Sequence, residues 1–432
     1  MKIRKPNLIF VLIGVICSIK IYIYNSLCSP FELLALIFFV SNIIFNLNNN
    51  SKLIKTKIFN SIRNLLFFWA AIQFISDVYN ESSFNDLLKG VGTPLLILLS
   101  VNLFLFLYEK SKSNLYFVSD IFIGVALTNI FYGLTSGFSL ETYLKFGGII
   151  KLLSAFVCLI PNNYINFGAT IFMALLSILF QIRSVLMQLI LFIILKIKIF
   201  NKFKISFPIL SHNPKTYKIV LNGLLNYLVI IFILIISNPL FDLATNIFTL
   251  NNFNNDRAEV IKDQIDTNSG IFAARIEYYS FFSQFIDSPI FGHGSWANDE
   301  EYKYVIESER RSYQNKGLND YEILRRIKMV NYLENRESFI PFHSYIMQVV
   351  TWGGIFAASF FFYLLNISIY ALIKKNLYTI EVLFLVNHIF NTLFSPIGSH
   401  RFIIPIVCLM LMIIYLRKDF DEKSSKNIFT IN

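Results

Sequence analysis

The sequence predicts an all-α polytopic integral membrane protein with about 12 transmembrane helices and one large, partly helical extracytoplasmic loop. Three observations carry this prediction. Aliphatic, aromatic and cysteine residues make up 55% of the 432 positions, and the mean hydropathy is +0.57, too apolar for a soluble globule. Apolar runs recur along the chain, and basic residues gather in alternate connections between them.

Each apolar run has roughly 17 to 25 residues, enough to cross a hydrocarbon core of about 30 Å as a helix. The runs lie near 8–26, 31–48, 61–79, 91–108, 115–135, 147–161, 166–182, 184–200, 217–240, 345–372, 378–397 and 402–416. The sixth, seventh and eighth are short and closely spaced, so the count is given as about 12.

Charge placement predicts the orientation. Lysine and arginine cluster before the first run, after the second, after the fourth, between the eighth and ninth, after the tenth and after the last. These positions fall on one side if the chain alternates, and the positive-inside rule makes that side cytoplasmic. Both termini are therefore expected inside.

The chain is expected to have three parts. Residues 1–241 form an N-terminal transmembrane bundle of about nine spans, and residues 242–344 form the outer loop. Residues 345–432 supply about three further spans and a cytoplasmic tail. The loop holds 16 acidic and 11 basic residues, whereas the whole chain carries a net charge of +11. The positive charge thus reflects topology, and no nucleic-acid partner is expected.

Coarse structure is predicted within the loop. An apolar stripe at helical spacing predicts a helix over 271–286, and Pro-Ile-Phe-Gly-His-Gly-Ser-Trp at 289–296 predicts a turn. Two charged helices are expected near 299–314 and 319–336. They are too polar to enter a bilayer, which favours a lid over its outer face.

Three residues around the loop are candidates for chemistry. Arg183 lies at the predicted outer mouth between the seventh and eighth runs, and Arg275 lies on the first loop helix. A guanidinium can hold a phosphate through two parallel hydrogen bonds. The alternative readings are an interfacial arginine and a surface helix arginine. His343 stands where the loop re-enters the membrane. A histidine can act as a general base near neutral pH, although an interfacial structural role is the alternative.

Three further residues are secondary candidates. His293, in the Gly-His-Gly turn, is a possible second catalytic group, with capping of the turn as the alternative. His400 and Arg401 lie in the last outer turn and are candidates for phosphate contact.

The ordered motifs resemble a known family. Gln-Ile-Arg-Ser-Val-Leu begins a span at 181–186, and Ala-Arg-Ile-Glu-Tyr-Tyr at 274–279 lies in the loop with the turn at 288–295. Pro-Phe-His-Ser-Tyr-Ile-Met-Gln at 341–348 then opens the next span, which continues through Gly-Gly-Ile-Phe-Ala. This set is similar to the O-antigen polymerase and ligase superfamily, the Wzy and WaaL type proteins, over roughly 170–370.

The resemblance implies a GT-C-like glycosyltransferase of the bacterial inner membrane with its loop in the periplasm. Its donor would be an undecaprenyl-diphosphate-linked glycan, and neither a metal nor a cofactor is expected. Arg183 and Arg275 would bind the diphosphate and stabilise its developing charge. His343 would be the general base on the acceptor hydroxyl, which attacks the anomeric carbon with inversion. Partners would be the lipid-linked donor and acceptor, membrane lipids, a chain-length regulator and a flippase.

Alternatives remain within and outside this class. Ligases often show a His-Asn pair after the motif histidine, whereas Ser344 and Tyr345 follow here, which favours a polymerase over a ligase. A lipid-linked oligosaccharide flippase would also be polytopic, but would not ordinarily carry so long an outer loop. A chain-length regulator would have few spans and a coiled-coil loop.

Overall fold

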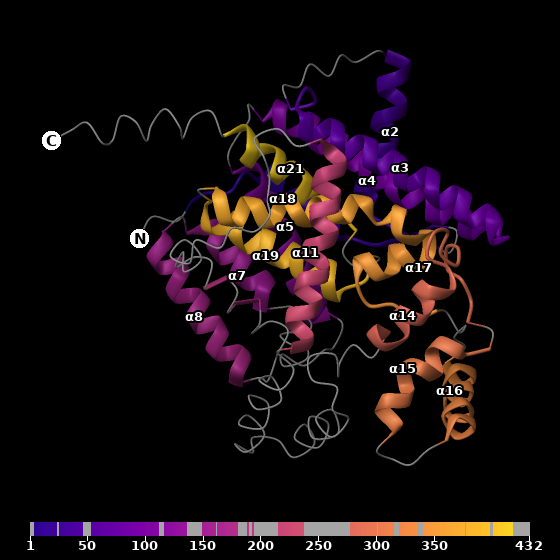
Figure 1. Cartoon of the computed structure of the whole chain (residues 1–432). Coiled ribbons are helices and arrows are strands. Elements are labelled where there is room, and N and C mark those ends of the chain that lie inside the picture. Colours follow the sequence, from indigo (N-terminus) through magenta and orange to yellow (C-terminus); the bar gives the residue numbers. More distant parts are fainter. Residues whose placement is uncertain are drawn as a thin grey trace.

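Over the residues that the structure describes, the fold is helical apart from one short hairpin. The computed structural model describes residues 4–23, 26–45, 53–111, 116–135, 149–160, 162–179, 188–189, 192–193, 215–236, 277–299, 301–314, 319–334, 340–375, 377–397 and 401–417. The elements (Figure 1) are α1 (Leu8–Ser18), β1 (Ile21–Ile23), β2 (Ser26–Cys28), α2 (Pro30–Phe45), α3 (Lys57–Tyr79), α4 (Phe84–Lys110), α5 (Phe117–Thr135), α7 (Ile149–Leu159), α8 (Asn163–Leu179), α11 (Thr216–Ile236), α14 (Glu277–Asp287), α15 (Lys303–Gln314), α16 (Asp320–Glu334), α17 (Tyr345–Ala357), α18 (Ser359–Lys374), α19 (Thr379–Phe394) and α21 (Ile403–Leu416).

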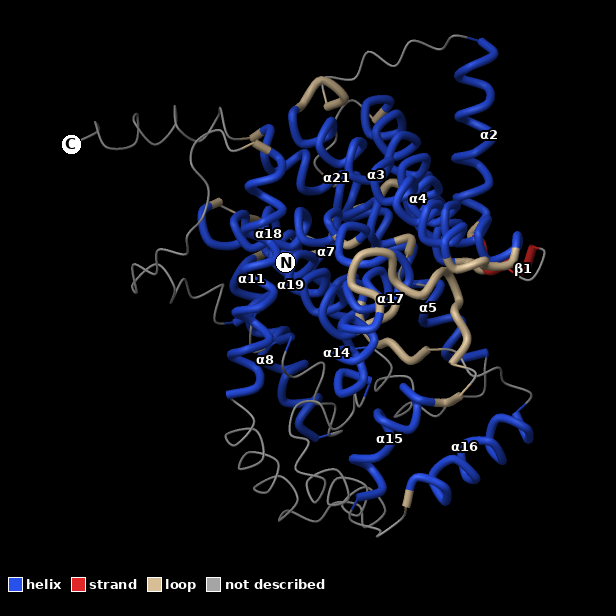
Figure 2. Tube along the Cα trace, turned by 45° about the vertical axis from the view of Figure 1, so that its right-hand side comes forward, coloured by secondary structure: helices blue, strands red, loops and turns tan. Residues whose placement is uncertain are grey.

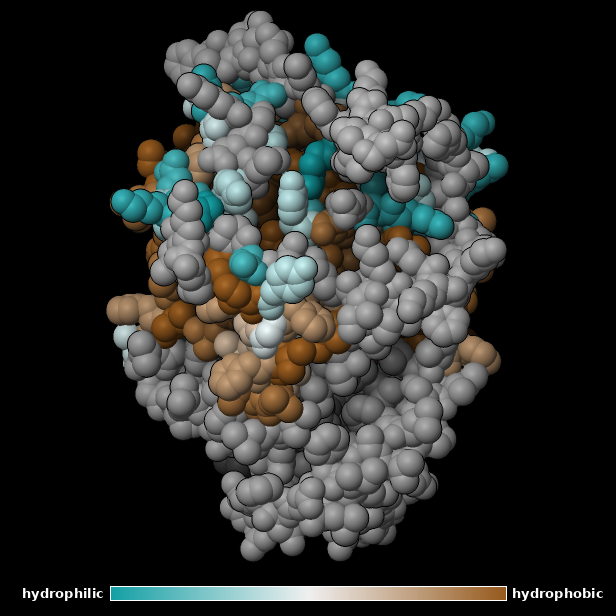
Figure 3. Space-filling model, turned by 90° about the vertical axis from the view of Figure 1, so that its left-hand side faces the viewer, coloured by the Kyte–Doolittle hydropathy of each residue, from teal (hydrophilic) through white to brown (hydrophobic). Residues whose placement is uncertain are grey.

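Several helices suit a membrane. Among the described residues, α3 and α4 are each long and apolar enough to cross one, and α17 with α18 form a bent pair that passes the same test together. Large apolar side chains are exposed on the bundle, for example Ile37 at 60%, Phe68 at 41% and Phe232 at 62%. One face shows a hydrophobic zone below hydrophilic residues (Figure 3). Such exposure is unfavourable in water but ordinary against lipid, so the fold is that of a helical membrane protein.

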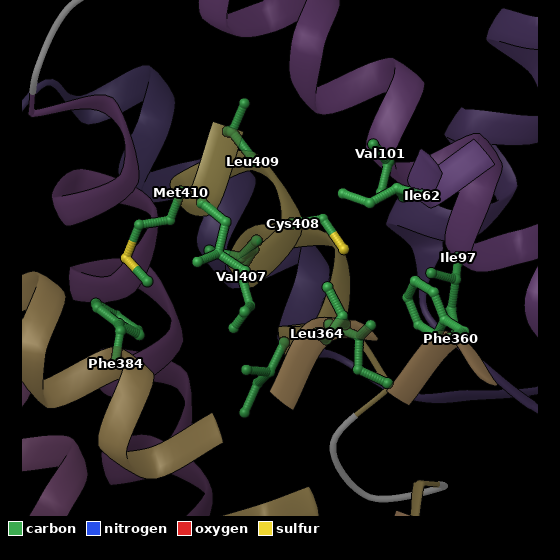
Figure 4. Close-up of a cluster of buried hydrophobic side chains, with 14 of the residues drawn as sticks. Ile62, Ile97, Val101, Phe360, Leu364, Phe384, Val407, Cys408, Leu409 and Met410 are labelled. Carbon is green, nitrogen blue, oxygen red and sulfur yellow. The ribbon is translucent and has the colours of Figure 1, made fainter. Parts of the chain in front are cut away.

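The centre of the bundle is formed by α17, α18, α19 and α21. Side chains such as Phe360, Leu364, Val407 and Cys408 are fully buried, and Ile62 of α3 packs with them in one continuous core (Figure 4). In lipid, close packing of this kind supplies much of the attraction between helices. The last part of the chain is therefore the core around which the N-terminal helices are arranged.

The tenth predicted span, 345–372, is not one continuous helix. Its two halves, α17 and α18, are bent by 104°. Gly354 has φ 74° and ψ −178°, which requires glycine, and a Cβ there would overlap the carbonyl oxygen of Ile290. The expectation of an uninterrupted span was wrong because hydropathy does not report backbone breaks that neighbouring chain can satisfy.

The turn at 289–294 fills this break. The backbone N–H of His293 donates to the Thr351 carbonyl at 2.7 Å, and that of Gly294 donates to the Trp352 carbonyl at 3.0 Å. In the opposite direction, the backbone N–H of Ile355 donates to the carbonyl of Pro289 at 3.0 Å. The loop turn thus bonds backbone groups at the break, which couples the loop to the core.

The first predicted span, 8–26, is also too long. Helix α1 ends at Ser18, Ile19 has an extended backbone, and Ile21–Ile23 pairs antiparallel with Ser26–Cys28. Alternating isoleucine and tyrosine favours a strand over a helix, and hydropathy alone does not separate the two.

At one end of the bundle, called the basic end, termini of five helices meet. The Arg4 guanidinium, before α1, contacts the Asp120 carboxylate of α5. The backbone N–H of Arg4 donates to the carbonyl of Leu159, the last residue of α7, at 3.0 Å. Arg417, after α21, contacts Glu381 at the start of α19. These contacts define the basic end.

At the opposite end, called the loop end, the tip of α3 meets the loop and α17. The Ser76 hydroxyl donates to the Trp352 carbonyl at 2.6 Å, and the Tyr278 hydroxyl of α14 contacts the carbonyl of Leu393 near the end of α19. Helices α14, α15 and α16 lie together beside α17, toward the bottom of the view in Figure 2. The predicted helices near 299–314 and 319–336 correspond to α15 and α16.

Candidate functional site

The candidate site is a histidine and a glutamate at the loop end. Nδ1 of His343 lies 3.4 Å from Oε1 of Glu277, and the two side chains are 30% and 24% exposed. His343 precedes α17, whereas Glu277 is the first residue of α14. The pair therefore joins segments 66 positions apart in the sequence, and each group is half-buried and within reach of solvent.

The segment that carries His343 is held on both sides. The Gln284 side chain of α14 donates to the Pro341 carbonyl at 2.9 Å and accepts from the Thr351 hydroxyl at 2.8 Å. Ser344 caps α17 by accepting from the Met347 N–H at 2.9 Å. The histidine thus sits at a fixed bend between the loop and the core.

Helix α14 is held by contacts with α19 and α15. The helical spacing of Tyr279, Phe282 and Ile286 predicted its buried face, but Phe282 and Ile286 are 59% and 73% exposed. The apolar side chain that is buried is Tyr278, which is 6% exposed and packs in the core. Because Tyr278 neighbours Glu277, its contact with the end of α19 holds the start of α14 near His343. The Ser280 and Ser308 hydroxyls, 2.7 Å apart, tie α14 to α15.

A second carboxylate lies near the pair. Burial and the neighbouring Glu277 carboxylate raise the pKa of Glu309, on α15, above its usual range. At the start of α15, Lys303 and the Tyr304 hydroxyl donate hydrogen bonds to Asp287, the last residue of α14. These bonds lower the pKa of Asp287. The raised pKa favours the neutral form of Glu309 near the site. The hydrogen bonds to Asp287 hold α15 against α14.

We predict that Glu309→Gln stabilises the protein only at higher pH. The raised pKa means that the folded chain binds this proton more tightly than the unfolded chain, so the free energy of unfolding falls as pH rises from the ordinary glutamate pKa through the raised one. Glutamine does not titrate, so the free energy of unfolding of the variant does not fall for this reason. Its thermal midpoint should exceed that of the wild type above this window and match it below.

The measurement is thermal unfolding of the purified chain from about pH 4 to about pH 8. Glu301→Gln, at an exposed position of the same loop, is the control. A Glu309→Gln midpoint equal to or below the wild type at every pH would contradict the account.

The turn beside the site is fixed by a buried carboxylate. Asp77, near the end of α3, is fully buried and accepts from the Ser295 N–H at 2.5 Å and from the Ser295 hydroxyl at 2.9 Å. Gln73 and Ser82 donate to it at 3.3 Å each. Gly294 has φ 84°, a conformation that favours glycine. Asp77 is thus the anchor between α3 and the loop.

An aromatic group lies between this turn and His343. The Trp296 and Trp352 rings are 4.2 Å apart, and Phe342 packs edge-on against Trp352 at 5.6 Å. The Lys89 ammonium stands 5.6 Å from the Trp296 ring centre. Phe342, the residue preceding His343, therefore packs against this aromatic group.

The structure describes three of the six predicted site residues. His343 is at the site. His293 lies in the neighbouring turn, where Nε2 is 2.9 Å from the Gln284 carbonyl oxygen, and its role as a second catalytic group stays a prediction. Arg183, Arg275 and His400 lie outside the described residues.

Arg401 has a carboxylate partner. It holds Glu32 of α2 through two bonds, Nε to Oε1 at 2.6 Å and Nη2 to Oε2 at 2.9 Å, and the Glu32 side chain is 6% exposed. These are the fork positions that a phosphate would use. Phosphate contact by Arg401 remains a prediction, and it would require a rearrangement of this pair.

Two groups at the site were missed as functional candidates. Glu277 was seen only as a neighbour of Arg275, because pairing with His343 depends on long-range packing. Asp77 lies near the end of the third apolar run, and its role as an anchor was not predicted. A carboxylate at the end of an apolar run was the available signal, since such groups are usually partnered.

Comparison with protein-family models, with curated proteins and with solved structures found no match for the chain. Within the described part of the chain, no three His, Cys, Asp or Glu side chains are grouped so as to hold a metal ion, and metal independence stays a prediction. Fold and site define a helical membrane protein with a histidine–carboxylate pair at one end of its bundle.

Proposed function

We propose that this protein is an O-antigen polymerase, a glycosyltransferase that joins undecaprenyl-diphosphate-linked oligosaccharide repeat units at the periplasmic face of the bacterial inner membrane. The observation that carries the proposal is the placement of Glu277 against Nδ1 of His343. Histidine in the Pro-Phe-His-Ser motif is the general base that the family resemblance implies, and a carboxylate at Nδ1 is what such a base needs.

The proposed reaction is one inverting displacement. With Nδ1–H directed at Glu277, Nε2 of His343 takes the proton of the acceptor hydroxyl. The acceptor oxygen forms a bond to the anomeric carbon as the bond from that carbon to the phosphate oxygen breaks. Undecaprenyl diphosphate leaves with the bonding electrons, and no oxidant or reductant is needed.

Arg275 and Arg183 would stabilise the leaving diphosphate. Arg275 is two positions before Glu277, and two peptide units span at most about 7 Å between Cα atoms. We therefore propose Arg275 as a diphosphate ligand for the site of this pair. A guanidinium offers a diphosphate two parallel donors, which would lower the barrier by balancing charge as it develops.

In the proposed topology the basic end faces the cytoplasm and the loop end faces the periplasm. Contacts within the bundle support it: helix ends with expected cytoplasmic positions meet one another through Arg4, Asp120, Glu381 and Arg417, and expected outer ends meet through Asp77, Ser295 and Trp352. A chain that crosses the membrane about 12 times in alternating directions would place its helix ends in two such groups, one on each side.

Gene deletion followed by lipopolysaccharide electrophoresis tests the proposal. A polymerase deletion should leave lipid A core that carries a single repeat unit. Bare core alone would instead assign the ligase or flippase alternative. An unchanged full ladder would overturn the proposal and the ligase alternative together.

A further inference from the structure

A cavity at the basic end is not used by the proposed reaction. Its volume is about 280 Å³, near the lower end of the range for small-molecule sites. It lies among residues at or near the ends of α5, α7, α8, α19 and α21. The His343 site is at the opposite end of the bundle, so the cavity is a separate feature.

The cavity wall is amphipathic. Val118 and Phe384 are among the apolar wall residues, and Tyr378, Glu381 and Arg417 supply polar groups. An amphiphile with a small polar group fits this lining better than a free ion, which would leave the apolar wall without contact.

One wall residue has a specific hydrogen-bonding need. Asn166 is 2% exposed, and its side-chain N–H donates to the Ile160 carbonyl at 2.9 Å, which orients the amide. Its buried Oδ1 has no hydrogen-bond partner among the described residues. A buried amide oxygen without a donor is costly, so a ligand with a hydroxyl would satisfy it after a small adjustment.

Cations surround this end of the bundle. Arg417 pairs with Glu381 and lies 4.9 Å from the Tyr378 ring centre, and Arg4 lies 4.5 Å above the ring of Tyr116, another wall residue. Basic pockets between helices at the cytoplasmic surface are suited to anionic lipid headgroups. Because Arg4 is paired with Asp120 and Arg417 with Glu381, a phosphate at this wall would have to compete with Glu381 for Arg417.

We propose that this cavity binds the headgroup of an anionic, hydroxyl-bearing phospholipid of the phosphatidylglycerol class. The phosphate takes the place of Glu381 at Arg417, and Glu381 keeps the hydrogen bond from the Tyr378 N–H. A glycerol hydroxyl donates to Oδ1 of Asn166, and the apolar wall contacts the start of the acyl chains. The inference rests on the proposed topology of the basic end and is independent of glycosyl transfer.

The test is thermal unfolding of the full chain in nanodiscs of phosphatidylcholine, with phosphatidylglycerol or phosphatidylethanolamine added. Phosphatidylglycerol should raise the midpoint of the wild type by several degrees more than phosphatidylethanolamine does. Asn166→Ala should lose at least half of that difference. Arg63→Gln, at an exposed basic position of α3 away from the cavity, should retain it.

Native mass spectrometry provides a readout that does not depend on variant stability. Wild type should retain phosphatidylglycerol after detergent exchange, and a double Arg417→Gln, Glu381→Gln variant, which removes both charges together, should retain at least tenfold less. Equal retention by wild type and both variants would overturn the proposal. So would an equal midpoint shift from free glycerol 3-phosphate, which would mark a soluble ligand.

Discussion

His343→Ala should abolish polymer formation while the protein stays at its normal abundance in the membrane. Removing a general base typically costs about 10²–10⁴-fold in rate, enough to erase a visible ladder. The side chain is 30% exposed, so its truncation leaves no large void in the core. The measurement is complementation of a deletion strain, read on lipopolysaccharide gels beside an immunoblot of membranes.

Two companion variants make this result specific. Glu277→Gln keeps the size of the side chain but removes its charge, so it should lower kcat while leaving KM for the lipid-linked donor near the wild-type value. His212→Ala, which changes a histidine of the predicted cytoplasmic side, should leave the ladder intact. A near-normal ladder from His343→Ala would refute the assigned role.

Asp77→Ala should produce the largest loss of stability among single substitutions at the loop end. It removes the acceptor for Ser295, Gln73 and Ser82 at a fully buried position. Each buried donor left without a partner costs about 1–3 kcal/mol, so a total of about 3–5 kcal/mol is expected. Thermal unfolding in detergent measures the shift, and limited proteolysis should show faster cleavage within the loop.

Asp86→Ala is the matched control. Asp86 lies in the first turn of α4, where its side chain is 29% exposed and 3.6 Å from Lys89. Partly exposed ion pairs of this kind, near the surface, contribute about 0–1 kcal/mol. An Asp77→Ala midpoint indistinguishable from that of Asp86→Ala would show that the turn at 289–296 does not depend on this anchor.

The helical class was predictable because it follows from composition and apolar run length, which act locally. The helices of the loop were also predictable from the helical spacing of apolar residues in α14 and from the polar turns around α15 and α16. The buried face of α14 was predicted incorrectly, since Phe282 and Ile286 are exposed. The break at Gly354 was not, because its cost is offset by hydrogen bonds to the distant turn at 289–294. Likewise, the short helix α1 depends on a hairpin that hydropathy does not distinguish from a span.

The site was predictable in part. His343 stood out because a titratable residue occurs where the loop meets the membrane. Its partner Glu277 could not be inferred, because 66 positions separate the two and only tertiary packing brings them to 3.4 Å. Arg401 illustrates the opposite case: its position in an outer turn fitted a phosphate contact, whereas the bundle supplies Glu32 as an internal partner.

The most direct test of the proposed function is reconstitution of the purified chain in proteoliposomes with an undecaprenyl-diphosphate-linked repeat unit as both donor and acceptor. The account predicts a ladder of lipid-linked polymer and release of undecaprenyl diphosphate in step with bond formation, both lost in His343→Ala and retained in His212→Ala. A wild-type chain that only moves the lipid across the bilayer, or a His343→Ala chain that polymerises at the wild-type rate, would contradict it.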